Sequence, residues 1–349
     1  MSDSSPARVL VLDLMATSKN WALSEDGVEA IRRAAPADWE VRVVPAPTSS
    51  DGDGAAAPSG EALAAVRDAE VYFGFGISRP LFRAAPRLRW VHSAAAGVGA
   101  ALFPEMLASD VTLTNSAGVH AVPIAEYVVG GLLYLLRGFD VAVAQQREGR
   151  WDKQFFVALD SPLRELGDCR VLIVGAGGIG TAISTRLHAF GARVIGVRRR
   201  PERGTPAGFE RVVGPDALDE EISAVDVAVL AAPATPQTVG LLTAQRLARL
   251  PRGAIVVNVA RGTLVDEAAL VERIRCGALR GAVLDVFGEE PLPPASPLWR
   301  LRSVLLTPHV SPVSPRGYWR RGLALFLDNW ERYRAGRELR NVVDKEAGY

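Results

Sequence analysis

The stretch RVLIVGAGGIGTAISTRLHAFGARVIGVRRR, residues 170–200, decides the fold. An apolar run of strand length, 171–174, ends in a glycine cluster that has the spacing G-x-G-x-x-G at Gly175, Gly177 and Gly180. A segment of helical period follows, and a second β-branched run, 194–197, comes after it. This order of strand, glycine turn, helix and strand predicts a βαβ unit that binds a dinucleotide.

Each glycine of the cluster has an expected task. Gly175 permits the tight turn, Gly177 lets the backbone approach a pyrophosphate, and Gly180 lets the helix pack closely on the sheet. The free N–H groups at the start of the helix would then face the phosphates. A glycine-rich turn without a ligand is the alternative interpretation, but the elements on both sides of the cluster favour the dinucleotide site.

The residues after the second strand indicate which dinucleotide is bound. NAD sites usually have an acidic residue there that holds the ribose 2′-hydroxyl group. This chain has Arg198, Arg199 and Arg200 instead, and no acidic residue before Glu202. Guanidinium groups form charge-assisted hydrogen bonds with a 2′-phosphate, so the sequence favours NADP(H). In the alternative interpretation, the arginines form a solvated turn and NAD(H) is accepted.

Length and composition set the broad class of the protein. A chain of 349 residues predicts about two domains, and a net charge of +1 points neither to nucleic acid nor to an anionic membrane. Two cysteines, Cys169 and Cys276, do not form a disulfide framework. The N-terminal residues do not resemble a signal peptide, and no apolar run has membrane-spanning length. We therefore expect a cytoplasmic protein.

The first part of the chain predicts a small α/β domain with a parallel sheet. A helix is expected at 24–33, with Ser24 as its N-cap. Residues 45–60 are rich in helix and strand breakers and predict a loop. A long apolar helix at 121–147 is expected to enter the second domain. The strands expected in the first domain are 9–12, 41–44, 71–73, 88–91 and 111–114.

The second part predicts a doubly wound sheet of about six strands that ends near His309. The amphipathic helix expected at 317–337 is too short to form a domain, so we expect it to fold back on the first one. The first domain would then comprise residues 1–120 and 311–349, and the second residues 121–310. The elements expected in the second domain are strands at 171–174, 194–197, 225–230, 255–259, 282–286 and 304–306, and helices at 243–250 and 266–276.

Three reactive side chains follow three strands of this second sheet. They are Arg261, Glu290 and His309, and the carboxyl ends of parallel strands are where such sheets bind ligands. An arginine can hold a carboxylate, a histidine can exchange a proton with an alkoxide, and an acid can orient the imidazole. Glu289 is the alternative acid, but the proline after Glu290 favours Glu290. Gly262 is expected to leave room for a ligand beside Arg261.

Only four histidines are present in the chain. His309 is the expected proton donor. His188, on the helix after the glycine cluster, is expected to pack or to face solvent. His92 and His120 are the two that we keep open as residues lining the cleft.

The motifs together resemble the D-isomer-specific 2-hydroxyacid dehydrogenase family, which includes glyoxylate/hydroxypyruvate reductases and D-3-phosphoglycerate dehydrogenase. The matching stretches are VGAGGIG, VNVARGTLVDEAAL, GAVLDVFGEEPLP, PLWRLRSVLLTPHVSP and NWERYRAGRELRNVVD, and with flanking residues they span most of 111–344. The resemblance implies an α/β fold in which a Rossmann domain is inserted in a flavodoxin-like substrate domain. It also implies a homodimer formed through the Rossmann domain. We expect no metal ion.

The resemblance also assigns roles to residues. The family's catalytic arginine, glutamate and histidine fall on Arg261, Glu290 and His309, and the separation 290 − 261 = 29 agrees with the family. The remaining assignments are Asp285 for the nicotinamide carboxamide, Val259 and Ala260 for backbone contacts to the cofactor, Gly178 and Ile179 for the pyrophosphate, and the N–H groups of Gly97, Val98 and Gly99 for the substrate carboxylate.

The leading hypothesis is an oxidoreductase that uses NADPH in preference to NADH and interconverts small 2-oxo acids and D-2-hydroxy acids. Two alternatives stay open at this point. One is an activity of the D-3-phosphoglycerate dehydrogenase type. The other is a dinucleotide-sensing, corepressor-like binding protein, against which the presence of Arg261, Glu290 and His309 argues. The sequence does not identify the 2-oxo acid.

Overall fold

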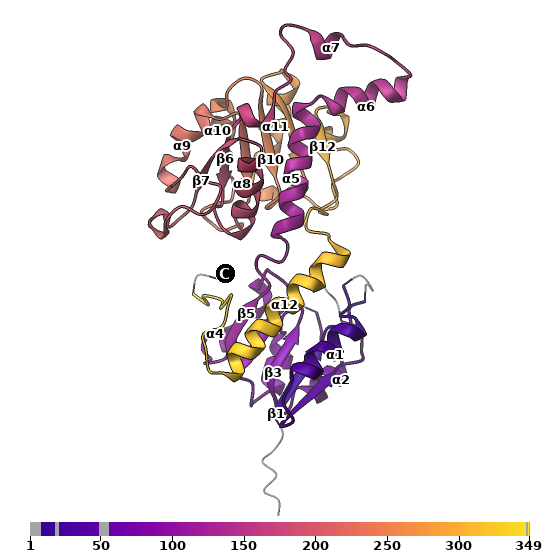
Figure 1. Ribbon diagram of the computed structural model, residues 1–349, viewed down its shortest axis with the longest axis vertical. Helices are drawn as coiled ribbons and strands as arrows, with labels where there is room; N and C mark the ends of the chain where they lie inside the picture. Colours follow the sequence, from indigo (N-terminus) through magenta and orange to yellow (C-terminus); the bar gives the residue numbers. More distant parts are fainter. Residues whose placement is uncertain (1–7, 18–20, 49–55, 347, 349) are drawn as a thin grey trace, which may run out of the picture. The chain divides into compact units, whose positions relative to one another are not determined.

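The computed structural model describes residues 8–17, 21–48, 56–346 and 348. The chain forms two compact units: unit 1 is Met1–Val119 with Ser314–Tyr349, and unit 2 is His120–Val313. Part of the loop expected at 45–60, residues 49–55, lies outside the described residues. Both units are α/β structures with a wholly parallel sheet, so the expected fold class is confirmed (Figure 1).

Unit 1 contains a five-stranded sheet in the order β2-β1-β3-β4-β5. Each of the five expected strands is present, with bounds shifted by one or two residues. Leu10 pairs with Val41 on one side and with Val71 on the other, which fixes the register at the centre of the sheet. The strands are β1 (Arg8–Asp13), β2 (Trp39–Val43), β3 (Ala69–Gly74), β4 (Trp90–Ser93) and β5 (Thr112–Asn115).

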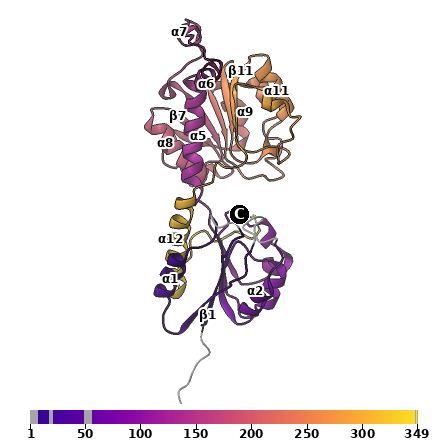
Figure 2. The ribbon, with the colours of Figure 1, turned by 90° about the vertical axis from the view of Figure 1, so that its right-hand side faces the viewer.

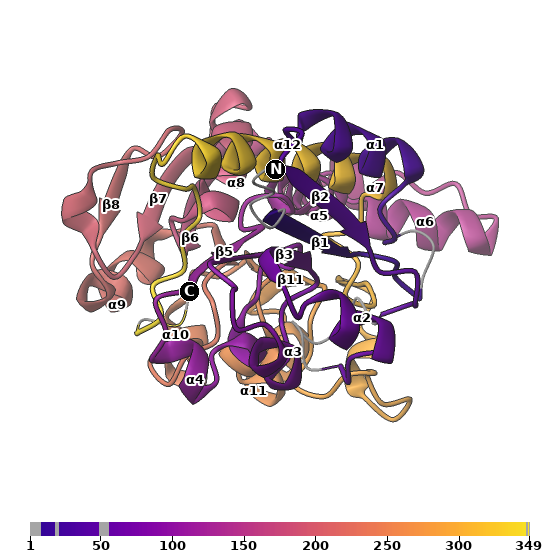
Figure 3. The same ribbon diagram turned by 90° about the horizontal axis from the view of Figure 1, so that it is seen from below.

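Helices cover both faces of this sheet. The face covered by α1 (Glu25–Ala34) and α12 (Pro315–Arg334), which lie side by side in Figure 2, buries large apolar residues of the strands. The other face is covered by α2 (Gly60–Ala65), α3 (Arg79–Ala84) and α4 (Pro104–Leu107), as Figure 3 shows. The helix expected near the C-terminus therefore does complete the first unit.

Aromatic side chains of α12 fix it to the sheet. Phe326 stacks on Phe73 of β3 with ring centroids 4.1 Å apart, and Trp330 lies against Trp39 of β2 at 4.6 Å. At the start of α1, the Ser24 side chain accepts a hydrogen bond from the Gly27 N–H, which confirms the expected N-cap. Burial of such rings contributes much of the stability of a core of this size.

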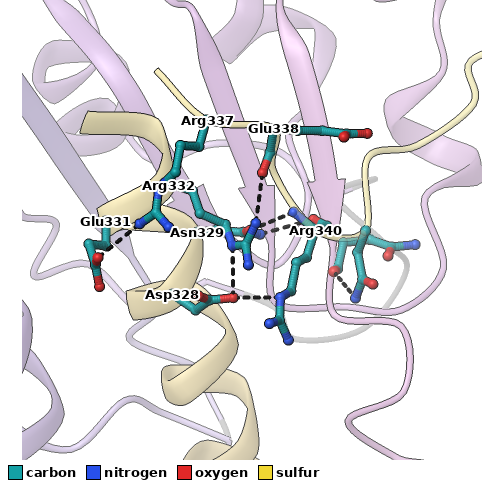
Figure 4. Close-up of polar contacts among 9 residues, drawn as sticks. Asp328, Asn329, Glu331, Arg332, Arg337, Glu338 and Arg340 are labelled. Atoms are coloured by element: carbon teal, nitrogen blue, oxygen red, sulfur yellow. Dashed lines mark hydrogen bonds and ion pairs between the residues drawn. The ribbon is translucent and has the colours of Figure 1, made fainter. Parts of the chain in front are cut away.

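The chain after α12 turns back along the helix and reaches the sheet edge. Asp328 forms ion pairs with both Arg332 and Arg340, and Glu331 forms one with Arg337 (Figure 4). The segment that follows forms an antiparallel bridge between Val342 and Thr114 of β5. The two ends of the described chain thus belong to one unit.

Unit 2 contains a seven-stranded sheet in the order β12-β11-β10-β9-β6-β7-β8. The expected number of about six was wrong because β8, a three-residue strand at the sheet edge, has no fully buried residue and so lacks an apolar run. The strands are β6 (Arg170–Val174), β7 (Arg193–Val197), β8 (Arg211–Val213), β9 (Val227–Leu230), β10 (Ala254–Asn258), β11 (Leu279–Leu284) and β12 (Val304–Leu306).

Two apolar layers enclose this second sheet. One layer contains α5 (Ala121–Leu136) and α8 (Gly178–Ala189), and the other contains α9 (Leu218–Glu221), α10 (Ala244–Arg249) and α11 (Glu267–Arg275). The helices expected at 243–250 and 266–276 are confirmed as α10 and α11. Short 3₁₀ turns lie at Gly99–Ala101, Leu166–Asp168, Pro201–Arg203, Pro215–Ala217, Ile222–Ala224, Gly262–Leu264 and Pro297–Arg300.

The single helix expected at 121–147 was wrong, because the chain breaks after α5. Gly138 adopts a left-handed φ of 71°, and a separate helix, α6 (Phe139–Glu148), begins after it. A buried ion pair of 2.6 Å between Asp140 and Arg280 of β11 holds the start of α6. Together with α7 (Gln154–Val157), α6 projects beyond the sheet of unit 2 (Figure 1).

Among the described residues, no single helix is long and apolar enough to cross a membrane. Only α5 and α6 taken together, which are bent by 66° to each other, reach the length and composition for that.

Candidate active site

The glycine turn after β6 has the geometry of a phosphate-binding loop. Gly175 has a φ of 110°, and a Cβ atom there would lie 2.6 Å from the Ala231 backbone. A Cβ atom on Gly180 would lie 2.1 Å from the Gly175 oxygen, so only glycine lets the helix pack here. Around Gly177, by contrast, the space is open. The turn therefore leaves room where the pyrophosphate is expected, and these residues fit a dinucleotide.

The start of α8 is the second part of this phosphate site. The helix begins at Gly178, and its N-cap residue, Gly177, makes no side-chain cap. The N–H groups of the first turn, which includes Gly178 and Ile179, therefore point along the positive end of the helix dipole toward the open space. Their contact with a pyrophosphate stays a prediction.

The arginines after β7 differ in their surroundings. The Arg198 guanidinium is half-buried and donates a hydrogen bond of 2.7 Å to the Gly204 carbonyl, which closes the loop that follows β7. Arg199 and Arg200 are exposed. Arg198 thus stabilises the loop after β7, whereas the guanidinium of Arg199 lies at the surface.

Arg261 lies in a tight turn after β10. Asn258, the last residue of the strand and almost fully buried, accepts a hydrogen bond from the Ala260 N–H and donates one of 2.9 Å to the Arg261 carbonyl. The exposed guanidinium of Arg261 donates to the Ala260 carbonyl at 2.7 Å. Sequence reasoning missed Asn258, although a polar residue at the end of a buried apolar strand was a usable signal. Val259 and Ala260 are buried in the same turn, and their cofactor contacts stay a prediction.

Gly262 does not leave room for a ligand, so that expectation was wrong. A Cβ atom on Gly262 would lie 1.8 Å from the carbonyl carbon of Phe287 and 2.3 Å from the nitrogen of Gly288. The backbone of the loop after β11 fills the space instead. The glycine is needed because the loop that carries Arg261 packs directly on the loop that leads to Glu290.

His309 and Glu290 form a hydrogen-bonded pair. Nδ1 of His309 lies 2.8 Å from Oε2 of Glu290, and Oε1 of Glu290 accepts a hydrogen bond of 2.9 Å from the Phe287 N–H. Burial acts to raise the pKa of Glu290, but the hydrogen bonds from His309 and Phe287 and the charges of His309 and Arg261 outweigh it, and the pKa lies below its ordinary value. The carboxylate that supports the imidazole is thus Glu290, as the sequence predicts.

An ionised carboxylate can only accept hydrogen bonds, so Nδ1 of His309 carries the proton in this pair. The other ring nitrogen, Nε2, is then the one that can exchange a proton with a substrate. The His309 side chain is 41% exposed, which leaves it accessible. This pair can therefore serve as a general acid and base.

Asp285 lies against the loop that carries His309. Its side chain is fully buried, and its carboxylate accepts hydrogen bonds from the Thr307 hydroxyl and from the N–H groups of Val310 and Ser311. Sequence reasoning assigned Asp285 to the nicotinamide carboxamide, which stays a prediction. The structure shows that it also holds the loop of His309.

Residues 97–99, the expected carboxylate-binding segment, belong to unit 1 and follow β4. The turn just before them is held by three groups: Tyr318 donates to the Ala94 carbonyl at 2.8 Å, Asn115 donates to the Ala96 carbonyl at 2.7 Å, and Ser116 binds it through its backbone N–H. The turn is therefore fixed from α12 and from the end of β5. Binding of a carboxylate by the N–H groups of 97–99 stays a prediction.

The other three histidines have different surroundings from His309. His92 is fully buried among aromatic rings, with Nδ1 2.7 Å from the Thr114 hydroxyl, and burial lowers its pKa to about 3. It packs in the core and does not line a cleft. His120 contacts the Pro312 carbonyl, and His188 is exposed. The described residues contain no group of three or more His, Cys, Asp or Glu side chains that could hold a metal ion.

Known proteins resemble the chain in sequence and in structure. Residues 129–311, just over half of the chain, match the family model for the NAD-binding domain of D-isomer-specific 2-hydroxyacid dehydrogenases. Glyoxylate/hydroxypyruvate reductase A of Salmonella paratyphi B is 36% identical over 235 residues, which cover 65% of this chain and 72% of the relative.

Two solved structures are similar over nearly the whole chain. A D-isomer-specific 2-hydroxyacid dehydrogenase of Xanthobacter autotrophicus Py2, in complex with NADPH and MES, is 31% identical and has a TM-score of 0.76, with 98% of this chain and 100% of that one covered. An NADPH-dependent glyoxylate/hydroxypyruvate reductase of Sinorhizobium meliloti, in complex with NADP and sulfate, is 29% identical and has a TM-score of 0.73, at the same coverage. The chain therefore belongs to the D-isomer-specific 2-hydroxyacid dehydrogenase family and is an oxidoreductase that acts on a 2-hydroxy or 2-oxo acid with a nicotinamide dinucleotide.

Proposed function

We propose that the protein reduces small 2-oxo acids of the glyoxylate and hydroxypyruvate class to D-2-hydroxy acids, with His309 and Glu290 as the acid–base pair and Arg261 as the carboxylate-binding group. The observation that carries this proposal is the 2.8 Å hydrogen bond between Nδ1 of His309 and Glu290, at the sheet edge where the glycine turn also lies. The Salmonella and Sinorhizobium relatives, both named as glyoxylate/hydroxypyruvate reductases, support the substrate class.

The reaction needs a hydride and a proton at the carbonyl group. Bound NADPH supplies the hydride. The Arg261 guanidinium pairs with the substrate carboxylate through charge-assisted hydrogen bonds and turns the carbonyl toward the sheet edge. Nε2 of His309 gives its proton to the developing alkoxide, and Glu290 stabilises the imidazolium before that transfer. In the oxidative direction Nε2 takes the proton back.

A His309→Ala variant tests the proposal. Loss of a general acid typically lowers turnover by about 10²- to 10⁴-fold, so kcat with glyoxylate or hydroxypyruvate and NADPH should fall by that factor. His188→Ala, an exposed histidine of the same unit, is the matched control and should keep its kcat. Near-normal turnover by His309→Ala would refute the assigned role. If the wild-type protein oxidised no NAD(P)H with these or bulkier oxo acids, a dinucleotide-sensing binding protein would be the better hypothesis.

The preference for NADP(H) is the second part of the proposal. It is supported by arginines at the end of β7 in place of an acid, and by the NADPH and NADP in the Xanthobacter and Sinorhizobium structures. Arg199→Asp and Arg198→Asp should raise the KM for NADPH and spare that for NADH, because an acid repels the 2′-phosphate. Arg193→Asp, at the other end of β7, is the control. Equal loss with both cofactors would mean that the arginines serve only the loop.

We further propose that two copies of the chain associate through unit 2 and that the protein works in the cytoplasm. Phe139, Trp151, Val157 and Leu159, on α6, on α7 and beside them, are at least half exposed, and a second copy would cover such an apolar group. Trp151→Glu should convert a dimer into a monomer in sedimentation analysis, and a monomeric wild-type protein would refute the dimer. Two free cysteines, Cys169 and Cys276, fit a reducing compartment.

A further inference from the structure

The loop that carries His309 has a backbone conformation that needs support. His309 has a φ of 54°, in the left-handed region that residues other than glycine rarely adopt. Its N–H donates to the Asp285 carbonyl at 2.9 Å. The next two N–H groups, those of Val310 and Ser311, donate to the two oxygens of the Asp285 carboxylate, both at 2.8 Å. Asp285 therefore fixes three consecutive peptide groups of this loop.

The Asp285 carboxylate is itself held by a hydroxyl group. Thr307 donates to Oδ1 of Asp285 at 2.5 Å, and the Thr307 hydroxyl lies 2.7 Å from the hydroxyl of Tyr127 on α5. A threonine hydroxyl has one proton, and an ionised carboxylate can only accept, so the proton of Thr307 is directed at Asp285. Tyr127 must then donate to Thr307. The hydrogen bonds are therefore donated in one direction, from Tyr127 to Thr307 and from Thr307 to Asp285.

The surroundings of Tyr127 suit this donor role. Burial raises the pKa of Tyr127 to about 12, so its hydroxyl stays protonated at neutral pH. The ring belongs to the layer of α5 that packs against the sheet, which fixes the position of the hydroxyl. Tyr127 and Thr307 are half-buried and Asp285 is fully buried, and hydrogen bonds connected in series in such surroundings reinforce one another.

We propose that Tyr127 and Thr307 are positioning residues for the proton-transferring histidine. They orient the Asp285 carboxylate, and that carboxylate holds the peptide groups on and after His309 so that its imidazole meets both Glu290 and the substrate. Neither side chain needs to touch the substrate. This inference rests on the role of His309 proposed above.

Thr307→Val tests the inference most directly, because valine has nearly the shape of threonine and lacks the hydroxyl. Displacement of a reacting group by about 1 Å can cost about 10²-fold, so kcat should fall by about 10- to 100-fold while the KM for the oxo acid changes less than about threefold. Thr307→Ser keeps the hydroxyl, so its kcat should lie within about threefold of the wild-type value. Tyr127→Phe removes one hydrogen bond and should lower kcat by about 2- to 10-fold.

Tyr134→Phe is the matched control on α5. It removes the hydroxyl of a tyrosine two turns farther along the helix, near Asp140 and Arg280, and should leave kcat unchanged. The melting temperature of each variant shows whether the protein remains folded at the assay temperature. A kcat loss in the folded Thr307→Val protein that serine reverses would support the positioning role.

The double variant separates positioning from a general structural role. If Thr307 acts through His309, Thr307→Val should cause no further loss in the His309→Ala protein. A loss of the same factor in both backgrounds would overturn the inference. Unchanged kcat in Thr307→Val and Tyr127→Phe, with His309→Ala inactive, would also overturn it and leave the proposed function intact. An active His309→Ala protein would instead overturn the proposed function.

Discussion

Replacing Gly262 by alanine would place a methyl group inside the backbone of a neighbouring loop. The methyl carbon would lie 1.8 Å from the Phe287 carbonyl carbon and 2.0 Å from its oxygen. Ordinary van der Waals contact begins at 3.4 Å, so the two loops would have to move apart by about 1.6 Å, which is 3.4 Å less 1.8 Å. No rotamer change relieves this contact, because its partners are backbone atoms.

Both loops lead directly to active-site residues. Arg261 precedes Gly262, and Glu290 follows Phe287 by three residues. Overpacking of this kind typically costs about 1–3 kcal/mol of unfolding free energy, and the displacement exceeds the 1 Å that can lower turnover about 10²-fold. We therefore expect Gly262→Ala to lower kcat/KM about 100-fold or more. We expect its melting temperature to fall by about 2–4 °C for each kcal/mol lost.

The assay compares this variant with Gly281→Ala. A Cβ atom on Gly281 would lie 2.0 Å from the Ser303 oxygen, so the backbone clash is similar. Gly281 lies near the start of β11, about 13 Å from Asp285 along the strand. Gly281→Ala should lose stability and keep kcat/KM when measured below its melting temperature. Full activity in folded Gly262→Ala, or an equal activity loss in folded Gly281→Ala, would refute the reasoning.

Three further predictions concern charges in the two units. Burial lowers the pKa of His92 to about 3, so between about pH 6.5 and pH 3 the unfolded chain binds a proton that the folded chain excludes. Stability should therefore fall as pH falls, by up to about 1.4 kcal/mol per pH unit, and the melting temperature of His92→Phe should depend less on pH. Asp140→Ala leaves the Arg280 guanidinium buried without its carboxylate and should cost about 3–5 kcal/mol in urea unfolding, much of which Asp140→Leu with Arg280→Met should recover. Glu290→Gln leaves one acceptor oxygen for two donors, Nδ1–H of His309 and the N–H of Phe287, and should lower kcat by about 10²- to 10⁴-fold in steady-state assays, whereas Glu289→Gln should not.

Local patterns predicted most of the fold. The glycine spacing and the apolar runs on both sides of it identified β6, α8 and β7, because such signals lie within about 30 residues. The pattern failed at β8, a three-residue edge strand that has no fully buried residue. It also failed at Gly138, where the apolar character of 121–147 continues through a left-handed residue that ends the helix.

The sequence predicts those residues of the site that come directly after the ends of strands. Arg261, Glu290 and His309 each come just after a strand of one parallel sheet, so their common edge follows from the topology. The contact between Tyr127 and Thr307 joins residues 180 positions apart, and no periodicity reports it. The partner of Gly262 was misjudged for the same reason, because a glycine in a sequence does not show which backbone packs against it.

Because unit 1 contains segments from both ends of the described chain, it cannot be completed on the ribosome until α12 has been synthesised. Residues 120–313 emerge before α12, so unit 2 can close its core while the first sheet still lacks Phe326 and Trp330. At about 5–20 residues per second, the interval between residue 115 and residue 334 lasts about 11–44 s. Throughout it, Phe73 and Trp90 of the nascent chain have α1 on their face of the sheet but lack the Phe326 ring that stacks on both, and this uncovered part of the face is where a chaperone should bind.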